Sequence, residues 1–219
     1  SRAEFNSPDT DCFFMRRSDR YKTLETVVEL MTDRLPTAYG VNALTDIQIL
    51  CPSRMMDTGT FNLNNVLQSN LNPQTKDKHQ MAYKGIYFRE GDKVMQIKNN
   101  YDITFKKDNG ETGSGVFNGD VGYITEIDIR GSILKVRFDD RVVTYFSEDL
   151  SQLELAYAIT VHKSQGSEYD YVIIPLCDVP SRLVYRNLLY TAVTRAKKKL
   201  ILVGDESIWD AMVENDRKT

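Results

Sequence analysis

The stretch VIIPLCDVPSRLVYRNLLYTAVTRAKKKLILV, residues 172–203, determines the fold class. It begins with the apolar run 172–174 and ends with the apolar run 200–203. Strands that are apolar at every position are typical of parallel sheets whose two faces are both covered by helices. Residues 183–194, between the two runs, can form such a helix, and the pattern therefore predicts an α/β fold. The inward side of this helix is expected to consist of Leu189, Ala192 and Val193.

Two helices and a strand are expected before this stretch. The first helix follows a plausible cap at Ser18–Asp19, and Pro36 is expected to end it. Residues 46–51 predict a short strand, and a second helix is expected to stop at Asn72–Pro73. The apolar residues recur at helical spacing, as Tyr21, Leu24, Val28, Met31 and Leu35 in the first helix and Leu63, Val66, Leu67 and Leu71 in the second.

The character of the sequence changes near Gly85. From there the chain consists of short segments with strand character separated by turns, and Asn109–Gly110 and Asn118–Gly119 are strong hairpin signals. About five strands in roughly sixty residues predict a small antiparallel β-barrel. The expected organisation is an α/β domain in two parts, 1–84 and 151–219, with residues 85–150 inserted between them.

Composition excludes several classes of protein. The 219 residues carry a formal net charge of -3, which excludes a polycation that binds nucleic acid by bulk attraction alone. No apolar run approaches the ~18 residues of a membrane span, so no membrane association is expected. No secretory signal is visible, which favours a cytoplasmic location, and the opening Ser1 in place of methionine indicates an excised fragment.

The cysteines and histidines do not form a recognisable ligand pattern. Cys12, Cys51 and Cys177 are odd in number and far apart, and each lies in or beside an apolar run. This predicts reduced core thiols rather than disulfides. His79 and His162 have no ligand partner at a usable spacing, so no metal site is expected.

One segment has a marked charge bias. Between Val179 and Gly204 there is no acidic residue. A solvated basic face is the usual explanation of such a run, and a surface that faces phosphates is the alternative. The basic residues of the segment are Arg182, Arg186, Arg195, Lys197, Lys198 and Lys199.

Residues 160–170, TVHKSQGSEYD, contain the residue types of a phosphate-binding loop in a different order. A Walker loop requires G-x-x-x-x-G-K-[ST], with glycines before the lysine. Here Gly166 follows Lys163 and Ser164. A nucleotide would therefore be held without that loop.

Several segments resemble helicase motifs. AYAITVHKSQGSEYDYVIIPL (156–176) and RNLLYTAVTRAKKKLILVGD (186–205) resemble motifs V and VI of superfamily 1 helicases. The segments ILCPSRMMDTGTFNLNNVLQSNLNP, REGDKVMQIKNNYD and GVFNGDVGYI resemble the RecD-like DNA helicases of superfamily 1B, which move 5′ to 3′. The resemblance extends over about residues 46–204.

The resemblance implies an architecture and a set of partners. The α/β parts would be the second RecA-like domain, and the insertion would be its SH3-like β-barrel. The first RecA-like domain, which is missing from this chain, would bind most of the ATP and Mg²⁺. Single-stranded DNA would be the other partner of a monomeric enzyme, and the chain alone would be inactive.

The resemblance also implies roles for individual residues. Arg195 would be the arginine finger that stabilises charge on the γ-phosphate. The nucleotide would also be contacted by Gly166, where backbone can approach phosphate, by Glu168, which can accept from a ribose hydroxyl, and by Gln165. The residues expected to contact DNA are Thr160, His162, Arg54, Asn118, Lys93 and Lys98.

Each of these residues also has a simpler explanation. Gly166 fits a turn, Glu168 a surface acid, His162 a satisfied core histidine, and Arg195 an exposed ion pair worth ~0–1 kcal/mol. The alternative function is a non-catalytic nucleic-acid or protein-binding module with a degenerate helicase fold. A motor needs Gly166, Glu168 and Arg195 together and a binding module does not, so their joint presence favours the motor.

Overall fold

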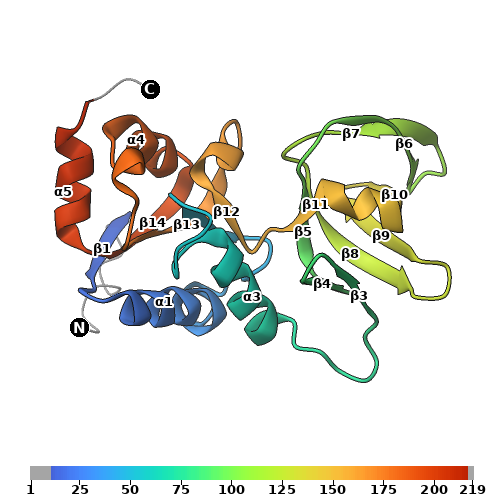
Figure 1. The fold of residues 1–219 in the computed structure, drawn as a ribbon, viewed down its shortest axis with the longest axis horizontal. Coiled ribbons are helices and arrows are strands. Elements are labelled where there is room, and N and C mark those ends of the chain that lie inside the picture. The colour runs from blue at the N-terminus through green and yellow to red at the C-terminus, as the bar shows by residue number, and fades with distance from the viewer. Residues whose placement is uncertain (1–10, 217–219) are drawn as a thin grey trace. The chain divides into compact units, whose positions relative to one another are not determined.

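The structure is a computed structural model that describes residues 11–216. It divides into two compact units, which are each described by themselves (Figure 1). The first unit comprises residues 1–66 and 158–219, and the second comprises residues 67–157. The expected insertion, 85–150, lies inside the second unit.

A five-stranded parallel sheet forms the centre of the first unit, with strand order β1-β14-β13-β2-β12. The two apolar runs lie in the adjacent strands β13 and β14, where Val172 pairs with Leu200. Every residue of β2 is buried, as expected for a strand covered on both faces. This confirms the predicted α/β fold class. The strands are β1 Cys12–Arg16, β2 Ile47–Cys51, β12 Ala158–Thr160, β13 Tyr169–Leu176 and β14 Ala196–Gly204.

Helices cover both faces of this sheet. Figure 1 shows α1 on one side and α4 on the other, which gives a three-layered unit. The helices of the chain are α1 Arg20–Glu29, α2 Leu35–Tyr39, α3 Thr60–Leu71, α4 Arg186–Val193 and α5 Glu206–Glu214. The short 3₁₀ segments are η3 Ser147–Gln152, η4 Val161–Ser164 and η5 Ser181–Leu183, and η2 Leu30–Arg34 is a π turn.

The first helix does not end at Pro36, which corrects the expectation from the sequence. After α1 the π turn η2 leads directly into α2, and the N–H of Leu35 donates to the carbonyl oxygen of Leu30. The wider turn accommodates the proline, which has no N–H to donate and would clash with a carbonyl in a regular helix. The helix ends instead at Gly40, whose φ of 65° is left-handed.

The buried face of α1 also differs from the predicted one. Tyr21 is 65% exposed, whereas Thr23 and Thr26 are buried together with Val27. The Thr23 hydroxyl donates to the carbonyl oxygen of Asp19, and the Thr26 hydroxyl accepts from Arg17. Because these hydroxyls are satisfied locally, threonines can occupy positions that hydrophobicity alone assigns to leucine and valine.

Strand β1 and helix α5 were not predicted. β1 is a short edge strand that pairs with β14, and Cys12 in it is exposed rather than a core thiol. Asp205 caps α5 by accepting from the N–H of Ser207. Trp209 of α5 then packs edge-on against Phe14, with ring centroids 6.3 Å apart.

The second unit is antiparallel and contains more strands than the five expected. Its main sheet has seven strands in the order β11-β5-β8-β9-β10-β6-β7, and β3 and β4 form a separate hairpin. The hairpin was missed because β3 precedes Gly85, where the change in sequence character was placed. β11 was missed because it follows residue 150, where the insertion was expected to end. The strands are β3 Gln80–Tyr83, β4 Ile86–Arg89, β5 Lys93–Gln96, β6 Asn100–Lys107, β7 Thr112–Val116, β8 Val121–Asp128, β9 Ile133–Phe138, β10 Arg141–Phe146 and β11 Leu153–Leu155.

Candidate nucleotide and DNA site

Residues 164–167 form a type II β-turn between η4 and β13. The N–H of Ser167 donates to the carbonyl oxygen of Ser164 over 3.0 Å. Gln165 has φ -58° and ψ 131°, and Gly166 has φ +83°. The third position of a type II turn requires a positive φ, which glycine adopts without strain. A Cβ on Gly166 would meet no heavy atom within 4 Å, so the space beside the turn is open.

Arg195 is held against this turn by three neutral acceptors. Its Nη1 donates to the carbonyl oxygen of Ser167 at 3.1 Å, and its Nε donates to the carbonyl oxygen of Thr191 at 3.1 Å. Its Nη2 donates to the Thr194 hydroxyl at 3.2 Å. Within residues 11–216 these contacts include no carboxylate, so the positive charge of the half-buried guanidinium is positioned but not neutralised.

A tyrosine adjoins the same turn. The N–H of Tyr169 donates to the carbonyl oxygen of Arg195 over 2.8 Å, which joins the first residue of β13 to the residue before β14. Burial raises the pKa of the Tyr169 hydroxyl, although a hydrogen bond with Ser167 and the charge of Arg195 act in the opposite direction. The hydroxyl is therefore protonated at neutral pH and available as a donor.

The other two predicted nucleotide residues are exposed. Gln165 occupies the second position of the turn. Glu168 forms an ion pair with Lys197 over 3.5 Å, in which both side chains are more than half exposed. Such an exposed pair is weak, so Glu168 can exchange Lys197 for another partner at little cost. The structure therefore brings Gly166, Ser167 and Arg195 together, with Glu168 at the edge of the group.

The residues expected to contact DNA from this unit lie at the opposite ends of the strands. Thr160, the last residue of β12, pairs with Cys51, the last residue of β2. Arg54 follows β2 and is exposed, and His162 is exposed in η4. Because the sheet is parallel, these residues belong to its carboxyl ends, whereas Arg195 precedes β14 at the amino ends.

Two of these side chains have local roles in the structure. The Thr160 hydroxyl caps η4 by accepting from the N–H of Lys163 over 3.3 Å. The Nε2 atom of His162 lies 3.5 Å from the Tyr185 hydroxyl, at the edge of hydrogen-bonding range. His162 is therefore neither a buried core histidine nor free of protein contacts.

The basic run on β14 is paired with acids from other segments. Lys198 lies 2.8 Å from Asp170, and this carboxylate raises the pKa of the lysine. Lys199 lies 3.5 Å from Asp11, and Lys197 pairs with Glu168 as described. These three lysines of the segment therefore lie on a mixed, ion-paired face.

The predicted DNA residues of the second unit differ in accessibility. Lys98 and Asn118 are exposed in the loops after β5 and β7. The N–H of Asn118 donates to the Asn99 side chain over 2.9 Å. Lys93 is only 3% exposed, and its carbonyl oxygen accepts from the N–H of Ala156. Burial makes Lys93 the least favourable of these candidates for a phosphate contact.

Helix α3 and the residue directly after it carry a row of amides that the sequence interpretation missed. Asn64, Gln68 and Asn72 recur every four residues, and all three are buried. Within the first unit the Asn64 side chain donates to the carbonyl oxygen of Ala158 at 2.9 Å and accepts from its N–H at 2.8 Å. It thereby holds β12, the strand that leads into the motif V segment. The spacing of four between amides on a helix was the available signal.

The other two amides surround a buried carboxylate in the second unit. Asp92 is fully buried and accepts from Gln68 at 2.6 Å, from Asn72 at 2.7 Å and from the Tyr157 hydroxyl at 2.7 Å. Burial raises its pKa, and the hydrogen bonds from these donors and from the N–H of Arg89 oppose that shift. This network joins the end of α3, the residue before β5 and the residue before β12.

No metal-binding cluster occurs in the described part of the chain. Among residues 11–216, no three His, Cys, Asp or Glu side chains are grouped so that they could hold an ion. No helix in the same range has both the length and the apolar character needed to cross a membrane. Cys51 and Cys177 are buried free thiols, and burial raises the pKa of both.

Two protein families match separate parts of the chain. Residues 63–138 match the SH3 domain of ATP-dependent RecD-like DNA helicases. Residues 155–203 match the C-terminal domain of UvrD-like helicases. The second match includes the turn at Gly166 and the Arg195 segment, so the site described above lies within a helicase domain.

The relatives are much longer than this chain. The ATP-dependent RecD2 DNA helicase of Deinococcus radiodurans is 34% identical over 172 residues, which cover 78% of this chain and 22% of that protein. The RecBCD enzyme subunit RecD of Mycobacterium tuberculosis is 32% identical over 166 residues, covering 75% and 26% respectively. The chain thus spans about a quarter of the length of these relatives.

Solved structures show a more distant likeness. The Pif1 helicase from Bacteroides in complex with ADP-AlF3 and ssDNA is 16% identical with a TM-score of 0.47, covering 86% of this chain and 49% of that one. This likeness is too distant to support an argument. The two domain matches and the RecD relatives instead agree with the motifs quoted from the sequence. The chain belongs to the RecD-like helicase family and contains that family's SH3 domain followed by a UvrD-like helicase C-terminal domain.

Proposed function

We propose that this chain is the part of an ATP-dependent RecD-like helicase that contributes Arg195 to ATP hydrolysis and moves 5′ to 3′ on single-stranded DNA. The observation that carries the proposal is the geometry of Arg195, whose charge is fixed beside an open glycine turn and has only neutral acceptors among residues 11–216. We expect a cytoplasmic monomer in which a first RecA-like domain of the same polypeptide binds most of the nucleotide.

The position of Arg195 suits contact with a phosphate presented from outside the unit. Ligands of open α/β sheets usually gather at the carboxyl ends of the strands, whereas Arg195 lies at the amino ends. A nucleotide that reaches Arg195 would therefore be held by another surface. The residues beside Arg195 suit phosphate oxygens, and they offer no cluster of oxygen ligands for Mg²⁺, which we expect that other surface to bind.

The chemistry of Arg195 follows from its present partners. Phosphoryl transfer spreads negative charge over the γ-phosphate oxygens, and a guanidinium stabilises that charge. Exchanging the carbonyl oxygens of Ser167 and Thr191 for phosphate oxygens replaces hydrogen bonds to neutral acceptors with stronger hydrogen bonds to anionic ones. Arg195 can therefore favour the transition state over the ground state.

The segment from Thr160 to Ser167 would couple Arg195 to the residues that we expect to contact DNA. The Ser167 carbonyl that binds Arg195 lies seven residues after Thr160, at the other end of the strands. Release of this carbonyl when Arg195 turns toward phosphate would alter the turn at Gly166. The change would reach Thr160 and His162, which we expect to contact the DNA backbone together with Arg54.

The test is Arg195→Ala in the full-length polypeptide that contains this chain. Steady-state ATPase at saturating single-stranded DNA should fall by roughly 10³ to 10⁵, while nucleotide affinity changes far less. Arg195→Lys should restore little, because an ammonium cannot present the planar fork of the guanidinium. Arg182→Ala, which removes an exposed arginine of the same basic run, is the matched control and should leave turnover unchanged.

A loss below about tenfold in Arg195→Ala would contradict the proposal. It would favour the non-catalytic binding module, in which Arg195 only supports the turn. The isolated chain should show no DNA-stimulated ATPase in either case. Turnover by the pure chain that disappears with Arg195→Ala would disprove the expected need for the other RecA-like domain.

A further inference from the structure

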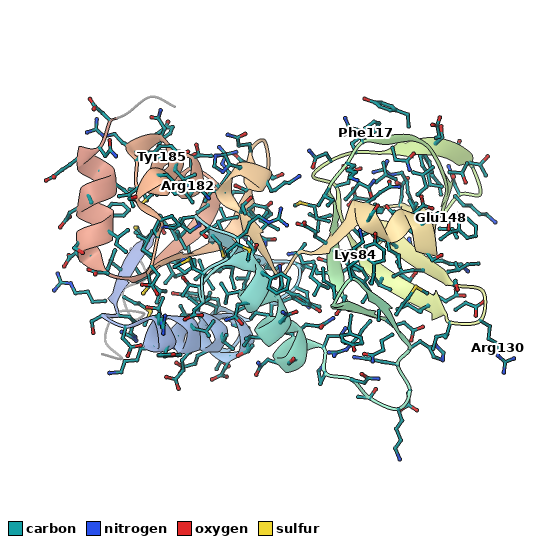
Figure 2. All side chains as sticks on the ribbon, viewed as in Figure 1. Lys84, Phe117, Arg130, Glu148, Arg182 and Tyr185 are labelled. Atoms are coloured by element: carbon teal, nitrogen blue, oxygen red, sulfur yellow. The ribbon has the colours of Figure 1, made fainter. Side chains whose placement is uncertain are left out.

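A groove of about 840 Å³ lies on the outer side of α1 in the first unit. Its apolar lining consists of Tyr21, Leu24 and Val28 from α1 and Val66 from α3, and every lining residue belongs to this unit. Tyr21 is 65% exposed, and the other three are half-buried. Figure 2 shows side chains that project from α1 away from the sheet. The groove is therefore open to solvent.

The groove gives α1 a second apolar side. Tyr21, Leu24 and Val28 recur at steps of three and four, the spacing that places side chains on one face of a helix. The side of α1 that the unit buries contains Thr26 and Val27 instead. A surface helix of a globular unit needs one apolar stripe. A second stripe at helical spacing indicates that α1 packs against a further element.

Tyr21 is held in place at the groove. The guanidinium carbon of Arg20 lies 5.0 Å from the centre of the Tyr21 ring, and Nη2 of Arg20 donates to the Tyr21 hydroxyl at 3.2 Å. The Nε of Arg20 lies 3.0 Å from the Asp57 carboxylate. These contacts fix the ring before a partner arrives, which lowers the entropic cost of docking.

The charged residues of the groove are mostly acidic. They are Asp19, Glu25 and Glu29 against Lys22, so three negative charges and one positive charge give a net charge of -2. Glu25 and Glu29 lie one turn apart, where like charges repel. Neither forms an ion pair within residues 11–216. A cation from outside the unit would offset this repulsion, so charge complementarity favours a basic partner.

The charge of the groove excludes several occupants. Acidic side chains repel the phosphates of DNA and the anionic surface of a membrane. A second copy docked through the same groove would bring like charges together. Among residues 11–216, helices α2 to α5 contain one basic residue, Arg186, so a second copy offers no basic helix either.

We propose that the groove docks an amphipathic helix of another protein, in which lysine or arginine borders the apolar side. In this mode of recognition, apolar anchors at helical spacing enter a groove, and charged residues at its rim fix the register. The proposal uses none of the residues assigned to ATP or DNA, so it is independent of the proposed function. It adds a partner protein to the chain.

The test uses a fluorescein-labelled peptide of about 18 residues, or about five helical turns, with leucine on one side, lysine on both borders and alanine elsewhere. Fluorescence anisotropy compares it with a peptide of the same composition in scrambled order and with one that has glutamate in place of lysine. The chain should bind the first peptide at least about tenfold more tightly than either of the others, because only the first combines the apolar side with the positive charge.

Variants of the chain locate the contact. Tyr21→Ser should weaken binding of the first peptide by about fivefold or more, the loss expected when an aromatic anchor is truncated. Glu29→Lys replaces an attraction with a repulsion and should weaken binding by roughly 3- to 20-fold. Glu148→Lys, at an exposed acid of the second unit labelled in Figure 2, changes the net charge equally and is the matched control. It should leave the affinity within about twofold.

A second measurement does not depend on the variants. A benzophenone on the apolar side of the peptide should cross-link to residues 19–32 or to Val66, as identified by mass spectrometry. Cross-links only at other residues, or equal binding of the ordered and scrambled peptides, would overturn the proposal.

Two results would assign the groove to a different occupant and overturn the proposed partner. Concentration-dependent dimerisation of the chain that Tyr21→Ser abolishes, measured by sedimentation velocity, would assign the groove to a second copy. Peptide binding by the chain that disappears in the full-length polypeptide would assign it to another segment of the same polypeptide.

Discussion

Removal of the Asp92 carboxylate should destabilise the second unit by about 2–4 kcal/mol. Asp92 is fully buried and accepts four hydrogen bonds of 2.6 to 2.7 Å, from Gln68, Asn72, Tyr157 and the N–H of Arg89. A hydrogen bond to a charged group contributes ~1.5–3 kcal/mol, and a buried donor that loses its acceptor costs ~1–3 kcal/mol. The change Asp92→Ala affects all four donors at once.

Two features make the expected loss of stability in Asp92→Ala smaller than the summed contributions of the four hydrogen bonds. The Gln68 and Asn72 amides also donate to the carbonyl oxygens of Tyr87 and Glu90, and they keep these acceptors. Burial raises the pKa of Asp92, so removing the carboxylate also removes the cost of a buried charge. These offsets give the estimate of about 2–4 kcal/mol.

The hydroxyl of Tyr157 provides an internal check on this reasoning. Tyr157→Phe alone should cost about 1–2 kcal/mol, because it removes one donor from a buried anion. In the Asp92→Ala background the same change should cost less, because the charged acceptor is already gone. The coupling energy should be about 1 kcal/mol or more.

Urea unfolding followed by two signals can locate the effect. Trp209, the single tryptophan, packs on Phe14 in the first unit, whereas far-UV circular dichroism reports on both units. Asp92→Ala should shift a transition seen by circular dichroism, and Asp102→Ala, at an exposed acid, should shift neither signal. A loss below about 1 kcal/mol, or strictly additive effects of Asp92→Ala and Tyr157→Phe, would refute the reasoning.

Two further predictions concern backbone conformation and pH. Gly166→Ala and Gly110→Ala should each cost about 1–2 kcal/mol of stability, since both glycines have positive φ and no atom within 4 Å of a Cβ. Only Gly166→Ala should lower the ATPase of the full-length polypeptide, because only its turn contacts Arg195; equal activity losses in the two variants would contradict this. Because the folded pKa of Asp92 is raised above the unfolded value of about 3.9, the folded state binds more protons just above that pH. The stability of the wild type relative to Asp92→Asn should therefore fall as pH rises from about 4 toward 7 in urea titrations, and a difference that grows would mean that the hydrogen bonds outweigh burial.

The sequence was sufficient for those parts of the fold that depend on hydrophobicity over several residues. The runs at 172–174 and 200–203 predicted two adjacent buried strands, and Val172 pairs with Leu200 in the structure. Hydrophobicity was insufficient for α1, whose buried threonines are tolerated only because Asp19 and Arg17 satisfy their hydroxyls. Such a pairing depends on the folded backbone and has no signature in a hydropathy pattern.

The same distinction applies to the candidate site. Gly166 and Arg195 were identified from a resemblance, and the structure places them around the Ser167 carbonyl. The acceptors of Arg195 include two backbone carbonyl oxygens, which every residue possesses, so no residue type could have marked them. Conversely, Lys93 has a suitable side chain for phosphate, but β5 buries it. Residue type therefore predicts which chemistry is possible, and burial decides which side chains can take part.

The segment between Thr160 and Tyr169 has little slack, which gives its proposed coupling role a physical basis. Thr160 is level with Cys51 on β2, and Tyr171 is level with Ile47, four residues earlier on that strand. Tyr169 lies two residues before Tyr171, so the segment from Thr160 to Tyr169 must return past about six residues of strand, or ~20 Å. The 3₁₀ residues of η4 rise only ~2 Å each, and the ends of a β-turn lie within ~7 Å. Even if fully extended, the two steps from Ser167 to Tyr169 add only ~7 Å, so the segment can span little more than the distance it must cover. A displacement of the Gly166 turn by Arg195 must therefore move Thr160 or unwind η4, because no loose residues are available to absorb it.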